Sequence, residues 1–138
     1  MPTPKKHSRE TLKVVHSPTL SRPEDWKRWV IPNYVWNKWK SLGLDDEALQ
    51  AFEIAVMMNP KGAPVVPGTG GLRKCRFARK GRGKSGSYRV GYVYFEQFGV
   101  IALLAVYAKN EQGEIPMAQR RQIKEAIGEL HAWLEGGG

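Results

Sequence analysis

The densest group of chemically active side chains lies in residues 73–89, RKCRFARKGRGKSGSYR, a segment with no acidic residue. Its eight basic residues are Arg73, Lys74, Arg76, Arg79, Lys80, Arg82, Lys84 and Arg89. The whole chain carries a net charge of +9. Protein surfaces normally mix the two signs of charge, so a segment of one sign indicates a binding site for a polyanion, most often a nucleic acid. A basic surface that only maintains solubility, or that docks an acidic protein, is the alternative.

Residues 81–86, GRGKSG, match the dinucleotide pattern G-x-G-x-x-G and end like a phosphate-binding P-loop. Both patterns need a helix N-terminus directly after the glycines to hold the phosphates. The following residues 87–95, SYRVGYVYF, are typical of a strand, and Ala78 occupies the place of the first P-loop glycine. We therefore interpret residues 80–86 as the connection of a β-hairpin and not as a nucleotide pocket.

The sequence disfavours several kinds of catalysis. His7, His16 and His131 lack the spacing of a metal pair, and the basic segment has no carboxylates for a two-metal nuclease. Cys75 alternates with Phe77 on the expected core face, which indicates a structural cysteine. We expect no metal and no cofactor. Metal-free RNA cleavage remains open, because the 2′-OH of the RNA is the nucleophile and clustered cations can supply the base, the acid and the stabilising charge.

In the N-terminal half, the sequence predicts one short strand and three helices. The strand covers about 11–16, and a capping box in SRPE starts a helix over 22–29. Asn33 is expected to cap a second short helix, and Asp45 or Asp46 a third one that ends at NPKG. Four tryptophans at 26, 29, 36 and 39 form two i, i+3 pairs that we expect to close these helices over a sheet. A stacking platform for bases is the alternative.

In the C-terminal half, the pattern changes to strands over 71–79, 87–95 and 99–107. The first alternates apolar and basic residues, and the last is apolar at every position, which is typical of a buried central strand. Pro116 then opens a helix to about Leu134, with an apolar stripe on one side. Helices, then strands, then a helix predict an α+β fold with an antiparallel meander.

The 138 residues suit one domain. The longest apolar run, at 99–107, is shorter than the ~18–20 residues that span a bilayer, and the N-terminus lacks the apolar region of a signal peptide. A single cysteine excludes an internal disulfide. We expect a cytoplasmic protein with no membrane partner.

Three motifs occur in order: PGTGGLRK at 67–74, GRGKSG-SYRV at 81–90 and YAKNE at 107–111. With them the chain resembles the RelE/HigB-like toxins of bacterial type II toxin–antitoxin modules, in the RelE/ParE superfamily. The resemblance is strongest over about 60–115 and extends over a toxin domain at 44–138. Residues 1–43 are then an N-terminal extension with Trp-rich short helices.

The resemblance implies a microbial-ribonuclease-type fold, with helices packed on an antiparallel sheet. It also implies an endoribonuclease (mRNA interferase) that needs no metal, cleaves mRNA on the translating ribosome and is blocked by a cognate antitoxin, expected to be of the helix-turn-helix type. Two alternatives stay open. ParE-like relatives inhibit gyrase without cutting RNA, and a basic RNA-binding module could have lost toxicity.

The resemblance also suggests roles for individual residues. Arg89 in YRV matches an arginine that contacts the scissile phosphate, and Lys74 and Arg76 match a basic pair for proton transfer and phosphate binding. Lys84 is a candidate for neighbouring phosphates or proton transfer. Tyr107 and Lys109 match aromatic and basic positions that orient groups or donate a proton. The remaining basic residues of the segment, Arg73, Arg79, Lys80 and Arg82, are expected to bind RNA.

Overall fold

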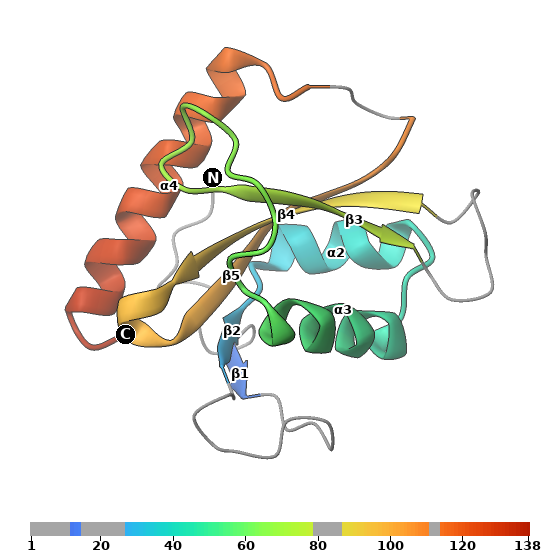
Figure 1. Ribbon diagram of the computed structural model, residues 1–138, viewed down its shortest axis with the longest axis horizontal. Coiled ribbons are helices and arrows are strands. Elements are labelled where there is room, and N and C mark those ends of the chain that lie inside the picture. The colour runs from blue at the N-terminus through green and yellow to red at the C-terminus, as the bar shows by residue number, and fades with distance from the viewer. Residues whose placement is uncertain (1–11, 15–26, 79–86, 111–113) are drawn as a thin grey trace.

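Five strands form one sheet in the order β1-β2-β5-β4-β3 (Figure 1). The computed structural model describes residues 12–14, 27–78, 87–110 and 114–138. The strands are β1 (Leu12–Val14), β2 (Arg28–Val30), β3 (Arg73–Ala78), β4 (Ser87–Phe95) and β5 (Val100–Ala108). Helices α2 (Asn33–Ser41) and α3 (Asp46–Met58) pack on one face, and α4 (Met117–Glu135) packs on the other. The predicted α+β class is confirmed.

Strands β3, β4 and β5 form the predicted antiparallel meander, and β5 occupies the centre of the sheet. The prediction of an antiparallel sheet is wrong at one place, because β2 pairs in parallel with β5, from Arg28 opposite Val100 to Val30 opposite Ala102. Parallel neighbours need a long connection between them. Here α2, α3 and the β3–β4 hairpin lie between β2 and β5 in the chain, so the sheet is mixed.

The N-terminal predictions are confirmed in part. The short strand exists as β1, but the helix expected over 22–29 is wrong at its end, where Arg28–Val30 form β2; residues 22–26 lie outside the described residues. Trp29 belongs to the core on one face and Val30 to the core on the other. Only an extended chain points successive side chains to opposite faces, so tertiary pairing overrides the helical signal.

Helix α2 forms as predicted, but Asn33 is its first residue and not its cap. Pro32 precedes the helix with extended backbone, and its carbonyl accepts the N–H groups of Val35 and Trp36. Proline fixes its own φ and has no N–H to satisfy, so it can begin a helix without a capping side chain. The prediction for α3 is confirmed, since the Asp45 side chain accepts the N–H of Ala48 at 2.8 Å.

Each face of the sheet carries its own hydrophobic core. On the α2/α3 face, Phe52 is surrounded by the rings of Trp29, Trp39, Phe77 and Tyr92, with centroid distances from 5.4 to 6.4 Å. The expectation that the tryptophans close over the sheet is therefore confirmed for Trp39, whereas Trp29 is itself part of the sheet.

On the other face, the predicted stripe of α4 covers a second core. Its helix residues Ile123, Ile127, Leu130 and Leu134 pack with Leu72, Val93, Ala102 and Leu104 of the β3–β5 region, so α4 covers the half of this face that these residues form. No helix in the described part of the chain is long and apolar enough to cross a membrane.

Candidate functional site

Three basic residues of the meander, Lys74, Arg76 and Arg89, lie on the α4 side of the sheet, beyond the part that α4 covers. Arg76 on β3 lies directly opposite Arg89 on β4, and Lys74 lies opposite Gly91. Residues directly opposite each other in an antiparallel pair point to the same face, with Cβ atoms about 4.5–5.5 Å apart. Two like charges in such a pair cost stability, so the Arg76–Arg89 pair is typical of a place where an anion binds.

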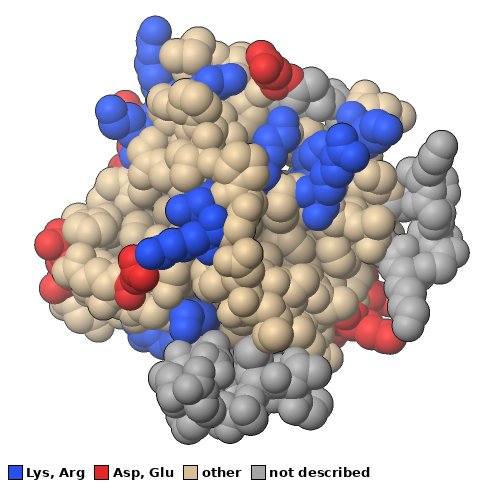
Figure 2. Space-filling model, in the orientation of Figure 1, with Lys and Arg blue, Asp and Glu red and all other residues tan. Residues whose placement is uncertain are grey.

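Figure 2 shows Lys and Arg side chains on this side of the molecule. Arg76 is exposed and Arg89 is half-buried. The Arg89 guanidinium lies along its own strand, with Nη1 3.4 Å from Ser87 Oγ and 3.5 Å from the Tyr88 carbonyl oxygen. These long contacts leave the group able to turn toward a bound phosphate.

A β-bulge places Tyr107 on the same face as Arg89. Ile101 and Leu103 of β5 belong to the α2/α3 core, and strict alternation would put Tyr107 there as well. The pairing shifts by one residue between Gly91 and Tyr92 of β4, so that Tyr107 lies opposite Arg89 and Val106 enters the α2/α3 core. Bulges are known for redirecting side chains in this way.

Lys74 reaches across the sheet to Tyr107. Its Nζ atom lies 5.6 Å from the centre of the Tyr107 ring, although the two residues belong to β3 and β5 with β4 between them. The residue of β4 that Lys74 faces is Gly91, which has no side chain. A cation over an aromatic face is attracted by the ring, so Tyr107 holds the ammonium group in place.

The hydroxyl of Tyr107 is buried and has no hydrogen-bond partner among the described residues; the side chain is 7% exposed. Leaving a buried polar atom without a partner costs about 1–3 kcal/mol. Such atoms are rare in native proteins, and some of them serve in catalysis or bind a ligand. Tyr107 lies beside Lys74, Arg76 and Arg89, which together form the cationic cluster.

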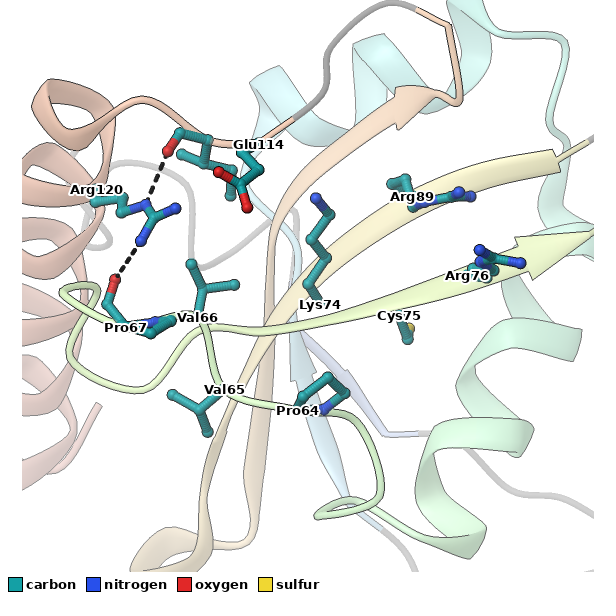
Figure 3. A pocket seen from close by; sticks show the side chains of 11 residues that line it. Pro64, Val65, Val66, Pro67, Lys74, Cys75, Arg76, Arg89, Glu114 and Arg120 are labelled. Carbon is teal, nitrogen blue, oxygen red and sulfur yellow. Dashed lines mark hydrogen bonds between the residues drawn. The ribbon is translucent and has the colours of Figure 1, made fainter.

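A pocket of about 330 Å³ lies beside these residues (Figure 3). One side is the cationic surface of β3 and β4, with Lys74, Arg76 and Arg89; the opposite side consists of the segment Pro64–Pro67 and of Glu114, Ile115 and Arg120. Its volume falls within the range of about 300–1,000 Å³ that is usual for small-molecule sites. Cys75 also lines the pocket, but its sulfur points to the other side of β3 from the Lys74 ammonium (Figure 3).

The segment Pro64–Pro67 is held rigidly. The Val66 N–H donates to the Leu72 carbonyl at 2.8 Å, and the Lys74 N–H donates to the Pro64 carbonyl at 3.1 Å. Thr69 is fully buried; its hydroxyl donates to the Val66 carbonyl and accepts the Leu72 N–H. Glycines with positive φ at 68, 70 and 71 complete the turn, which explains the PGTGG sequence structurally.

Arg120 joins the two loops that form the far side of the pocket. Its Nε donates to the Ile115 carbonyl at 2.8 Å and its Nη1 donates to the Pro67 carbonyl at 3.1 Å (Figure 3). These contacts link the segment after β5 to the segment before β3. Arg120 therefore fixes the width of the pocket by bonding to the protein itself.

The structure separates the other predicted residues from this cluster or leaves them outside its description. Arg73 points to the opposite face, where its Nη1 donates to the carbonyls of Lys61 and Ala63 at 3.0 and 2.7 Å and supports the loop after α3. Lys109 is exposed just after β5, with its N–H bonded to the Ser87 carbonyl. The residues outside the described ranges are Arg79, Lys80, Arg82 and Lys84.

Sequence reasoning missed the far side of the pocket. Glu114 brings a carboxylate to a region that the sequence presents as free of acids, and the sequence pattern indicates Arg120 only as part of the polar face of α4. The only signal was their position on either side of Pro116, where the chain turns into α4.

Among the described residues, no group of three or more His, Cys, Asp or Glu side chains is placed to hold a metal ion. A scan against protein-family models finds no family that matches this chain.

Proposed function

We propose that this protein is the toxin of a type II toxin–antitoxin module, a metal-independent endoribonuclease that cleaves mRNA on the translating ribosome. The observation that carries the proposal is the cluster of Lys74, Arg76, Arg89 and Tyr107 on the uncovered part of the sheet. These residue types can bind a phosphodiester and move a proton, and the three motifs of the resemblance each include residues of these strands, at 73–74, 87–90 and 107–108. The proposal includes a cytoplasmic location and a cognate antitoxin that blocks this surface.

In the proposed reaction, the 2′-oxygen of the RNA attacks the adjacent phosphorus and the bond from phosphorus to the 5′-oxygen breaks. The products are a 2′,3′-cyclic phosphate and a 5′-OH. Arg76 and Arg89 bind the phosphate and stabilise the charge that grows on its oxygens, because their donors are held near each other across two paired strands.

Lys74 is the candidate for proton transfer, because it lines the same pocket as Arg76 and Arg89 and an amine can give or take a proton there. Tyr107 orients Lys74 through its ring. Lys84 and Lys109 are assigned to neighbouring phosphates or to the proton donor, and Arg79, Lys80 and Arg82 to the flanking RNA backbone.

Substitution of Arg89 tests the proposal. Arg89→Ala should slow mRNA cleavage by about 10²–10³-fold and abolish growth arrest in a host without the antitoxin, because it removes charge from the transition state. Arg121→Ala is the matched control, since Arg121 is exposed on α4 and does not line the pocket. Mapping of RNA 5′ ends after induction measures cleavage, and thermal unfolding checks that both variants fold.

Three results would contradict the proposal, and each has a different meaning. Full toxicity of a folded Arg89→Ala removes that residue from the site. Growth arrest with intact mRNA and inhibited supercoiling by gyrase favours a ParE-like inhibitor. Harmless expression with salt-dependent RNA binding favours a basic RNA-binding module.

A further inference from the structure

The pocket beside the cationic cluster has two chemically different sides. The β3–β4 side offers Lys74, Arg76 and Arg89, whereas the segment Pro64–Pro67 offers apolar surface, including Val65 with 46% of its area exposed. Glu114 and Ile115 close the end where β5 leads into α4. A nucleotide has the same division, with a charged phosphate and a flat base that has polar edges.

Glu114 limits what the far end of the pocket can bind. An ionised carboxylate has only acceptors, so it repels a phosphate and needs hydrogen-bond donors from a ligand. Glu114 forms no ion pair with any residue that the structure describes, so none of these residues neutralises its carboxylate. In Figure 3 its carboxylate lies on the pocket side, between the guanidinium of Arg120 and the ammonium of Lys74.

The four RNA bases differ in what they offer to such a carboxylate. On its Watson–Crick edge guanine carries two adjacent donors, N1–H and the N2 amino group, which match the two oxygens of one carboxylate. Adenine and cytosine place an acceptor next to their amino group, and uracil has one donor between two carbonyl groups. Proteins that recognise single-stranded RNA commonly read this edge on unstacked bases.

We propose that this pocket binds one base of the RNA strand and prefers guanine, with Glu114 accepting hydrogen bonds from N1–H and the N2 amino group. The base packs against Pro64–Pro67, and its phosphate lies on the cations of β3 and β4. This inference rests on the proposed function, because it names the base that the same site selects. It makes Glu114 a specificity-determining residue.

The pocket is organised before any ligand arrives, which such recognition needs. The hydrogen bonds of Thr69 fix the turn behind the apolar wall, and those of Arg120 fix this wall relative to Ile115, the neighbour of Glu114. A preformed wall lowers the entropy lost on binding, so base selection can come from hydrogen bonds at the edge.

Binding of free nucleotides tests the inference without any need for cleavage. Guanosine 3′-monophosphate and adenosine 3′-monophosphate are titrated into the full-length protein, and dissociation constants are measured by calorimetry or NMR. The wild type should bind the guanosine nucleotide about 10-fold or more tightly, as expected for one bidentate contact to a base. Glu114→Gln should reverse the preference toward adenosine, because an amide offers one acceptor and one donor, which match N6–H and N1 of adenine.

Glu125→Gln is the matched control, an exposed glutamate on α4 that does not line the pocket, and it should keep the wild-type preference. Equal affinities in the wild type, no saturable binding of either nucleotide, or an unchanged preference in Glu114→Gln would each overturn the inference. These outcomes are distinct from failure of the proposed function. A protein that never cuts RNA can still show the guanosine preference, and an active nuclease can lack it.

Discussion

The two faces of the sheet are built from the same strands, but one is closed by helices and the other is partly open. On the α2/α3 face, two helices close over an aromatic core in which Trp39 and Phe52 are almost completely buried. On the α4 face, a single helix covers one half and leaves Arg76 exposed and Arg89 half-buried in the other. Alternate residues of β3 and β4 thus supply a closed core and an open cationic surface.

The contrast shows how a small domain can remain stable although one of its surfaces lowers the free energy of unfolding. Opposed arginines lower stability, and so does a buried hydroxyl with no hydrogen-bond partner among the residues that the structure describes. The closed face offsets this cost through packing on the other side of the same strands. We expect substitutions on the two faces to act on different properties, and the following experiments test that division.

The largest effect on stability is expected on the closed face. Phe52→Ala should lower the free energy of unfolding by about 3–5 kcal/mol, because it removes a ring that contacts Trp29, Trp39 and Phe77 and leaves a cavity among them. Arg76→Ala, on the open face, should change it by no more than about 0.5 kcal/mol. Denaturant unfolding measures both values. Similar losses in the two variants would contradict the division between the faces.

A smaller contrast concerns two neighbouring positions of β3. Burial raises the pKa of Cys75 to about 11, so little thiolate exists near neutral pH. In a Cys75→Ala background, Arg76→Cys would place a thiol on the open face among cations, which favour the thiolate. At pH 8 iodoacetamide should modify Cys75 about 100-fold more slowly than this new cysteine, because reactivity follows the thiolate fraction.

The pH dependence gives a second measure of the same contrast. The rate at Cys75 should rise about tenfold for each pH unit and level off only near pH 11, since the thiol stays protonated below its raised pKa. The thiol at position 76 should reach its plateau at a much lower pH. Equal rates, or plateaus at the same pH, would show that β3 does not divide the two environments.

The smallest effect concerns the boundary between the covered and open halves of the α4 face. A Cβ atom at Gly91 would lie 3.2 Å from the Leu72 side chain, which is fully buried, so Gly91→Ala should destabilise the protein by about 1 kcal/mol. Gly128→Ala is the control, because Gly128 is exposed in α4 with open space around it. It should stabilise the protein by about 0.5–1 kcal/mol. Thermal unfolding of the two variants should shift in opposite directions, and a shift of the same sign would contradict tight packing at Gly91.

Much of the architecture follows from the sequence because its causes are local. Alternation of apolar and basic residues defines β3, an apolar stripe defines α4, and Asp45 begins α3 as a capping residue. The same alternation places Lys74 and Arg76 on one face and Cys75 and Phe77 on the other. The basic character of the candidate site can therefore be predicted from consecutive residues of the sequence.

Only the tertiary structure decided the features that depend on distant segments. Trp29 lies in a strand because it pairs with β5, against the local helical signal. Tyr107 joins Arg89 because a bulge shifts the pairing of β4 and β5, and Arg73 turns away to support the loop after α3. Glu114 meets the cationic cluster because the chain after β5 packs against the Pro64–Pro67 segment through Arg120. Each outcome results from contacts between residues far apart in the sequence, which no local pattern encodes.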